Sequence, residues 1–231
     1  MALNSLGIVR RKIARADATA VKALSAHGVA TIHEAMGRVG LMKPFMRPAY
    51  PGAKLCGTAV TVLLQPGDNW MLHVAAEQIA DGDVVVAACV TDCTDGFFGE
   101  LLATSFRARG ARGLVIDGGV RDVAELAEMD FPVFSRAVSA QGTVKSTLGS
   151  VNVPIVCAGA TVNPGDVVIA DADGVVVVPA KNAAAVAAAA DKRVVNEGEK
   201  RATLAAGVLG LDMYKMREAL AKAGLRYVDE D

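Results

Sequence analysis

Aromatic residues are scarce in this chain of 231 residues, where Phe, Trp and Tyr together make up only 4%. Its core must therefore be built mainly from Ala, Val, Leu and Ile. Hydrophobic residues reach 52% and charged residues 21%, a balance that excludes a disordered protein. The length fits one compact domain, so we expect residues 1–231 to form a single domain with a helical C-terminal extension at 181–231.

The chain also lacks the features of nucleic-acid-binding, membrane and secreted proteins. Its formal net charge is −1 and it has no basic run, which argues against a nucleic-acid partner. The longest apolar runs, at 82–90 and 172–180, are too short to cross a bilayer. The short apolar stretch at the N-terminus precedes its Arg and Lys residues, the reverse of a secretory signal. We therefore expect a soluble, cytoplasmic protein.

No set of Cys or His residues has the spacing of a structural zinc site. We expect all four cysteines to be reduced and mostly buried: Cys56, Cys89, Cys93 and Cys157. The three histidines, His27, His33 and His73, are isolated from one another, and we expect His73 to face packing. A bound metal would therefore need oxygen ligands, which points to Mg²⁺ or Mn²⁺.

The first two thirds of the chain alternate between apolar strand patterns and helical patterns. Asp17 and Thr31 are expected to cap the first two helices. Strands are expected at 55–64, 84–90 and 114–116, and helices after 68–69, from 99 to 110 and before Pro132. This order predicts an α/β fold with a parallel or mixed sheet covered by helices.

In the last third of the chain the sequence pattern no longer alternates between strands and helices. Short β segments joined by turns at 163–166 and 171–174 predict a mostly antiparallel region. An Ala-rich helix is expected at 181–204, followed by a final helix that Gly224 ends. These last segments hold too little apolar bulk to fold alone, so we expect them to pack on a neighbouring subunit.

The segment at 114–126, LVIDGGVRDVAEL, is the most informative for function. A strand is expected to end at Ile116, two glycines to turn the chain, and Arg121 and Asp122 to begin the next helix. In open α/β sheets, ligands bind just beyond the carboxyl ends of the strands. An Arg beside an Asp there can hold a carboxylate and a cation. The alternative is that Asp122 caps a helix while Arg121 faces solvent.

Three further stretches have weaker patterns. Gly99 starts a helix, so the amides of Glu100, Leu101 and Leu102 could bind a carboxylate, or simply begin an amphipathic helix. Asn69 is either a polar ligand contact or a helix cap. Glu197 and Glu199 lie on the Ala-rich helix, where charged residues usually form a solvated face.

Three motifs, GELLA at 99–103, GGVRD at 118–122 and GLDMY at 210–214, together resemble the 4-hydroxy-4-methyl-2-oxoglutarate/4-carboxy-4-hydroxy-2-oxoadipate aldolases. The first two motifs alone indicate only the wider superfamily of the regulator of RNase E activity A. The resemblance spans residues 15 to 228. It implies an α/β sandwich with a swivelling β/β/α core, assembled as homotrimers or homohexamers.

The resemblance also implies roles for individual residues. Arg121 matches the substrate-binding arginine, Asp122 the direct metal ligand, and Glu197 a catalytic glutamate from the adjacent subunit, with Glu199 as the other candidate. The amides of Gly99–Leu102 match the pocket for the pyruvate carboxylate. Glu100 matches an acidic residue near metal-bound water, and Asn69 a polar residue near the distal end of the substrate.

The implied function is a divalent-metal-dependent (class II) aldolase of protocatechuate and gallate degradation. It would cleave 4-carboxy-4-hydroxy-2-oxoadipate to pyruvate and oxaloacetate, and 4-hydroxy-4-methyl-2-oxoglutarate to two pyruvates. Because oxaloacetate decarboxylation forms the same enolate, a decarboxylase side activity is expected. One rival is a Schiff-base enzyme using Lys54 or Lys145. The other is a non-catalytic regulator that binds an RNA-degrading enzyme.

Overall fold

The computed structural model describes residues 6–229, which fall into two compact units that meet between Ala190 and Asp191. The elements of the first unit, up to the start of α6, are α1 (Ala18–Leu24), α2 (Val29–Ala35), β1 (Arg47–Pro48), β2 (Leu55–Leu64), α3 (Trp70–Ala75), β3 (Asp83–Cys89), β4 (Gly96–Phe98), α4 (Glu100–Ala108), β5 (Gly113–Val120), α5 (Val123–Glu128), β6 (Val133–Val138), β7 (Ser150–Val151), β8 (Ile155–Cys157), β9 (Ala160–Val162), β10 (Val167–Asp171), β11 (Gly174–Val178) and a 3₁₀ turn (Ala180–Asn182). Helix α6 (Ala183–Ala205) crosses the boundary, and α7 (Gly210–Met213) and α8 (Arg217–Lys222) follow it.

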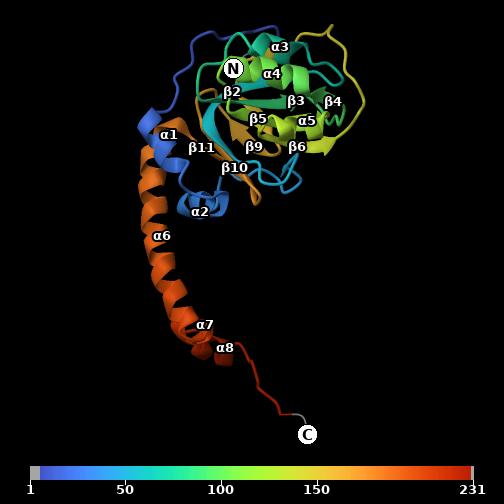
Figure 1. The fold of residues 1–231 in the computed structure, drawn as a ribbon. Helices are drawn as coiled ribbons and strands as arrows, with labels where there is room; N and C mark the ends of the chain where they lie inside the picture. The colour runs from blue at the N-terminus through green and yellow to red at the C-terminus, as the bar shows by residue number, and fades with distance from the viewer. Residues whose placement is uncertain (1–5, 230–231) are drawn as a thin grey trace. The chain divides into compact units, whose positions relative to one another are not determined.

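One mixed sheet organises the first unit, with strands in the order β1-β6-β5-β3-β2-β10-β11 (Figure 1). Strands β2, β3, β5 and β6 are parallel, as the alternating pattern predicted. Strands β10 and β11 are antiparallel, as predicted for the later region. The sheet curls until its two ends nearly meet, and Arg47 on β1 donates across the gap to the carbonyls of Ala172 and Asp173 in the β10–β11 turn, at 3.4 and 3.1 Å. The fold is therefore α/β with a nearly closed, barrel-like sheet.

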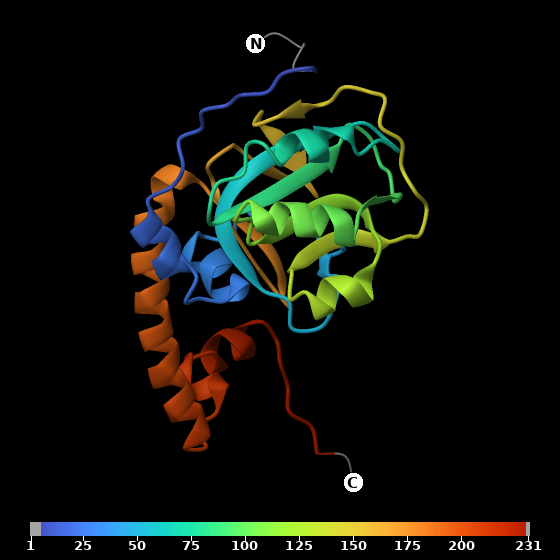
Figure 2. The same ribbon diagram turned by 45° about the horizontal axis from the view of Figure 1, so that its top comes forward.

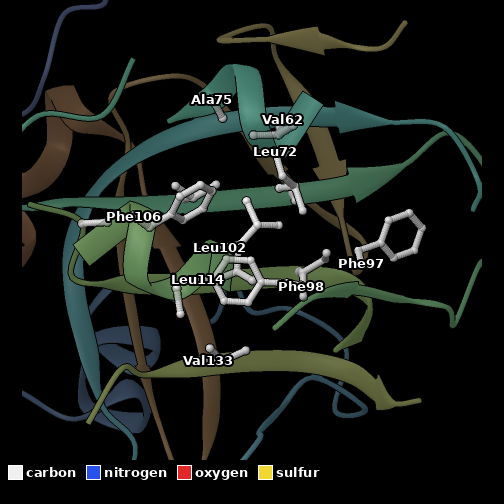
Figure 3. Close-up of a cluster of buried hydrophobic side chains, with 14 of the residues drawn as sticks. Val62, Leu72, Ala75, Phe97, Phe98, Leu102, Phe106, Leu114 and Val133 are labelled. Carbon is white, nitrogen blue, oxygen red and sulfur yellow. The ribbon is translucent and has the colours of Figure 1, made fainter. Parts of the chain in front are cut away.

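Three apolar clusters cover both sides of this sheet. Helices α3, α4 and α5 pack on the outer face of β2, β3 and β5 (Figure 2). The inside of the barrel is filled from β2, β3, β5, β8, β10 and β11, and α1, α2 and the first turns of α6 cover β10 and β11 from outside. The apolar cluster beneath α4 holds several of the few aromatic residues, and the rings of Phe98 and Phe106 lie 5.3 Å apart there (Figure 3). Burying such large side chains contributes roughly 1.5–3 kcal/mol each.

Two local predictions about the first unit are wrong. Strand β5 does not end at Ile116 but continues through Asp117, Gly118 and Gly119 to Val120. The glycines are there because another chain segment passes close by: a Cβ on Gly119 would lie 2.1 Å from the carbonyl oxygen of Thr94.

Thr31 does not cap the second helix, which begins earlier, after Gly28. The first amide of that helix, Val29 N–H, instead donates to Asp171 across the sheet, at 2.8 Å. Asp17 does cap α1, as predicted, by accepting from Ala20 N–H at 3.0 Å.

The second unit is helical, as predicted, but its last helix is divided. Lys215 adopts a left-handed conformation with φ of 54°, which separates α7 from α8. Gly224, with φ of 92°, follows α8 as the expected stop. Among residues 6–229 no helix is long and apolar enough to cross a membrane. All four cysteines lie within this range and are free thiols.

Candidate active site

A small cavity of about 150 Å³ lies at the carboxyl ends of β4 and β5. It is smaller than the roughly 300–1,000 Å³ of pockets for drug-sized ligands, so it suits a small acid. Its lining comes from the start of α3, from β4, from the start of α4, from the β5–α5 junction and from the loop after β6: Asn69, His73, Gly96, Phe97, Gly99, Leu101, Leu102, Arg121, Asp122, Gly142, Thr143 and Lys145.

Asp122 is fixed by the start of the neighbouring helix and not by its own. It adopts a left-handed conformation with φ of 55° and makes no cap hydrogen bond to α5. Its Oδ2 instead accepts from the amide of Glu100, at 3.0 Å. A Cβ on Gly99 would lie 2.1 Å from this oxygen, so only glycine allows the approach. Asp122 therefore does not cap α5, the helix that follows it, and its carboxylate instead bonds to the first amide of α4.

This contact also changes the expected carboxylate pocket. The amide of Glu100 is already occupied by Asp122, so a ligand at the start of α4 would meet the amides of Leu101 and Leu102. The side chain of Glu100 accepts from Thr104 Oγ1 at 2.9 Å. Glu100 is not part of the cavity lining, although Gly99 and Leu101, the residues directly before and after it, are.

Arg121 is anchored by its backbone and leaves its guanidinium available. Its amide donates to the carbonyl of Phe98 at 2.9 Å, which ties the end of β5 to the end of β4. Its Nε lies 3.8 Å from Asp122 Oδ2, longer than a hydrogen bond, and the side chain is half exposed. A Cβ on Gly142 would lie 3.7 Å from Nη1, an ordinary van der Waals contact, so Gly142 lies beside the guanidinium.

One polar atom of the Asn69 side chain is hydrogen-bonded and the other is not. Its Nδ2 donates to the carbonyl of Phe97 at 2.9 Å, while Oδ1 is buried and has no hydrogen-bond partner in the described chain. A buried acceptor left without a partner costs about 1–3 kcal/mol, so a ligand donor would be stabilising here. Asn69 precedes α3 without capping it through its side chain. The capping carboxylate is Asp68, which accepts from Trp70 N–H at 2.8 Å.

Asp68 holds the loop that closes the other side of the cavity. This carboxylate is 2% exposed and accepts from the amides of Ser146 and Thr147, both at 2.7 Å. Burial opposes ionisation, but the hydrogen bonds from Trp70, Ser146 and Thr147 outweigh it, so the pKa of Asp68 is lowered. Lys145, directly before these amides, is thereby positioned at the cavity.

Two cavity residues, His73 and Lys145, were not assigned to the site from the sequence. His73 was expected to face packing, but it is exposed at the cavity, one turn into α3 from Asn69. Partial burial and the nearby Lys145 both lower the pKa of His73, which keeps its imidazole neutral near pH 7. Lys145 was considered from the sequence only as a Schiff-base lysine, because its place at this cavity depends on the long-range contacts of Asp68.

Glu197 and Glu199 lie in the second compact unit. Glu197 forms an ion pair with Arg193 at 2.7 Å, one turn earlier on α6, and lines a shallow hollow with Lys200, Arg201 and Tyr214. Glu199 carries an exposed side chain, and its carbonyl accepts from Thr203 Oγ1 at 3.0 Å.

The cavity offers oxygen ligands of the kind that Mg²⁺ and Mn²⁺ prefer. Asp122 presents a partly exposed carboxylate there, and its Oδ1 has no hydrogen-bond partner among residues 6–229. No group of three or more His, Cys, Asp or Glu side chains suited to a metal occurs in this described part. One carboxylate with water completing the coordination is a usual arrangement for Mg²⁺, so the residues fit such an ion.

The relatives found by comparison with known proteins agree with one another. The RraA-like family model, described as aldolase/RraA, matches residues 29–177. A *Halalkalibacterium halodurans* protein provisionally named 4-hydroxy-4-methyl-2-oxoglutarate aldolase is 29% identical, over 79% of this chain and 87% of that protein. A *Burkholderia multivorans* protein of the same provisional name is 32% identical, over 62% and 87% respectively.

The solved structures show the same fold. The crystal structure of a *Streptomyces coelicolor* protein, described as an unusual member of the RraA family of RNase ES inhibitors, superposes with a TM-score of 0.73. It is 27% identical and covers 82% of this chain and 99% of its own.

Proposed function

The chain belongs to the RraA-like family, and from this premise we propose that it is a class II aldolase that cleaves 4-hydroxy-2-oxo acids. Its relatives named as aldolases support a lyase. The proposed substrates are 4-hydroxy-4-methyl-2-oxoglutarate and 4-carboxy-4-hydroxy-2-oxoadipate, from the breakdown of protocatechuate and gallate. The observation that carries the proposal is the Arg121–Asp122 pair, held at the start of α4 in a cavity of small-acid size.

The cavity residues suit the groups of such a substrate. The amides of Leu101 and Leu102 would hold the C1 carboxylate at the start of α4. Asn69 Oδ1 would accept from the C4 hydroxyl, which satisfies its unpaired oxygen. The ammonium of Lys145 would bind the distal carboxylate on the other side of the cavity.

Cleavage of the C3–C4 bond requires that the C4 hydroxyl loses its proton, which a water in the cavity would accept, so that C4 becomes a carbonyl. The electron pair of the broken bond places negative charge on the 2-oxo oxygen of the departing pyruvate unit, and this enolate then takes a proton at C3 to give pyruvate. A Mg²⁺ or Mn²⁺ held by Asp122 would act as a Lewis acid toward this charge. Arg121 would donate to the same oxygen through its planar guanidinium, and donors placed this way contribute about 2.7–4 kcal/mol in comparable sites. Decarboxylation of oxaloacetate develops the same charge, so it would be a side activity.

We also propose that Glu197 completes this site from an adjacent subunit in a homotrimer or homohexamer. The second unit exposes apolar side chains that a partner would cover, among them Val195, Leu209 and Tyr227. A ring of subunits would allow each tail to reach the next cavity.

A regulator of RNA degradation is the second candidate, because the *Streptomyces* relative is described within a family of RNase ES inhibitors. The close Gly99–Asp122 contact and the unpaired Asn69 Oδ1 suit a site for a small acid, and a docking surface would use neither of them. The aldolase is therefore favoured.

The test is pyruvate release from 4-hydroxy-4-methyl-2-oxoglutarate, with and without metal. We expect EDTA to abolish release and Mg²⁺ or Mn²⁺ to restore it. Asp122→Ala should keep the fold, measured by circular dichroism, and lose the restored activity. Asp130→Ala is the matched control, because Asp130 is also left-handed, with φ of 49°, and follows the other end of α5. Full activity in a sample shown to be metal-free would contradict the class II assignment.

A further inference from the structure

A second and larger cavity, of about 510 Å³, lies at the amino ends of the parallel strands. It shares no lining residue with the candidate active site. Strand β5 runs from Gly113 at one cavity to Val120 at the other. At about 3.3 Å per residue, the two cavities are separated by roughly 23 Å. Nothing in the proposed aldolase reaction uses this second cavity.

The topology brings several chain segments together there. Strand β10 runs antiparallel to β2, which places Ile169 and Ala170 beside Cys56 and Leu55. Arg112 directly precedes β5, and the segment from Asp130 to Pro132 directly precedes β6. The last turn of α4 and the loop at 25–28 complete the walls.

Three cationic side chains line this cavity without a salt bridge. Within the described chain, no carboxylate oxygen lies within 4.0 Å of the charged atoms of Lys54, Arg107 or Arg112. A cation in the last turn of a helix is ordinary, which accounts for Arg107 on α4. That explanation does not apply to Lys54 and Arg112, which lie outside helices at the starts of β2 and β5.

The two acidic residues of the cavity, Asp130 and Asp171, form no salt bridge with these cations in the described chain. Asp171 accepts from the amides of Val29 and Asp173, at 2.8 and 2.9 Å, so its carboxylate is committed to the backbone. Burial raises the pKa of Cys56 to about 11, although Arg112 opposes the shift, so the thiol carries no charge at neutral pH. Asp130 is the remaining carboxylate of the lining.

The floor of the cavity is apolar, formed by buried Leu55, Phe131 and Ile169. A bound ligand would therefore contact apolar side chains at the base of the cavity and cationic side chains at its rim. The volume falls within the roughly 300–1,000 Å³ usual for small-molecule sites.

We propose that this amino-end cavity binds a small organic anion that carries two or more carboxylate or phosphate groups. Arg107 and Arg112 each present a planar fork that matches either group, and Lys54 adds a third positive charge. Binding here does not depend on the aldolase activity, so the two proposals can fail separately.

The test is isothermal titration calorimetry on the intact protein at low salt, with citrate and pyrophosphate as probes and acetate as the single-charge control. We expect citrate or pyrophosphate to bind, and acetate to bind much more weakly. The tighter of the two probes identifies carboxylate or phosphate as the preferred group. The double variant Arg107→Gln/Arg112→Gln should bind at least about tenfold more weakly, since charge-assisted bonds are lost.

Two single variants serve as controls. Arg109→Gln removes a neighbouring arginine that caps α4 outside the cavity and donates to the Ala76 carbonyl. Arg109→Gln should leave binding unchanged. Arg121→Gln alters the other cavity and removes any probe binding there, so the binding that remains in this variant belongs to the amino-end cavity. Lys54→Gln, at an exposed position, replaces the double variant if that protein does not fold.

Absence of binding by both probes would overturn the proposal. So would equal binding of acetate, an equal loss in Arg109→Gln, or loss only in Arg121→Gln.

Discussion

The two ends of the parallel strands carry charge in different ways. At the carboxyl ends, the Asp122 carboxylate is held by the amide of Glu100, and the backbone of Arg121 is anchored through its amide to the carbonyl of Phe98. At the amino ends, the side chains of Lys54, Arg107 and Arg112 are exposed and form no salt bridge within residues 6–229. The first cavity is also less than a third of the volume of the second.

This difference assigns separate roles to the two cavities, bond cleavage to one and ligand binding to the other. Catalysis requires groups held within fractions of an ångström, because small displacements cost large factors in rate. Binding of a flexible anion tolerates mobile cations, which act largely through charge. The carboxyl-end cavity is therefore the better candidate for bond cleavage, and the amino-end cavity for a ligand that remains intact.

The comparison is tested most severely by exchanging arginine for lysine at each end. Arg121→Lys should lower kcat/KM for pyruvate release by about a hundredfold or more, because an ammonium cannot replace the planar donor pair. Arg112→Lys keeps the charge at the amino-end cavity and should leave kcat/KM unchanged. Steady-state kinetics on the two proteins measure both effects. Near-normal kcat/KM in Arg121→Lys would remove Arg121 from the chemistry.

The sequence predicted the elements whose signals are local. The strand at 55–64, the Asp17 cap and the helix after Gly99 follow from short patterns, and all three occur in the structure. The sequence misplaced the end of β5, because paired glycines resemble a turn when the segment crossing them at Thr94 is unknown.

The candidate site likewise contains residues that local sequence patterns identify and residues that they do not. Arg121, Asp122 and Asn69 stood out through motif and position, and the structure brings them to one cavity. His73 and Lys145 depend on contacts between distant segments, such as the bond from Asp68 to Thr147. No local pattern reports such contacts.

A smaller effect is expected at Glu197, which tests whether the carboxyl-end cavity is complete within one subunit. Glu197→Ala should lower activity by about tenfold to a hundredfold if it acts there. Refolding it together with Arg121→Ala should restore activity in about one quarter of sites, because each site in a closed ring needs both intact residues.

Glu199→Ala is the matched control, two residues away on α6. If Glu199 is the acting residue, the pattern of loss and recovery should move to that variant. If mixtures shown by mass spectrometry to contain hybrid assemblies recover no activity, neither glutamate belongs to a site shared between subunits.

The smallest effect is expected at Asp68, which supports the carboxyl-end cavity without touching the substrate. Its two oxygens accept from Trp70 at 2.8 Å and from Ser146 and Thr147 at 2.7 Å. Asp68→Asn replaces one acceptor with an NH₂ group, which cannot accept, and should lower the free energy of unfolding by about 1.5–3 kcal/mol. Because the pKa of Asp68 is lowered in the folded protein, its contribution is present above the unfolded value of about 3.9. It is lost as the pH falls through the folded pKa.

The kinetic result separates positioning from mere stability. Lys145 is proposed to bind the distal carboxylate equally in the ground state and the transition state. Its displacement in Asp68→Asn should therefore raise KM, by about tenfold, and change kcat little. Asp173→Asn is the control, because its exposed side chain lies at the β10–β11 turn, away from this loop. A fall in kcat at unchanged KM, measured where the variant is fully folded, would show that Asp68 acts on the reacting atoms and not through Lys145.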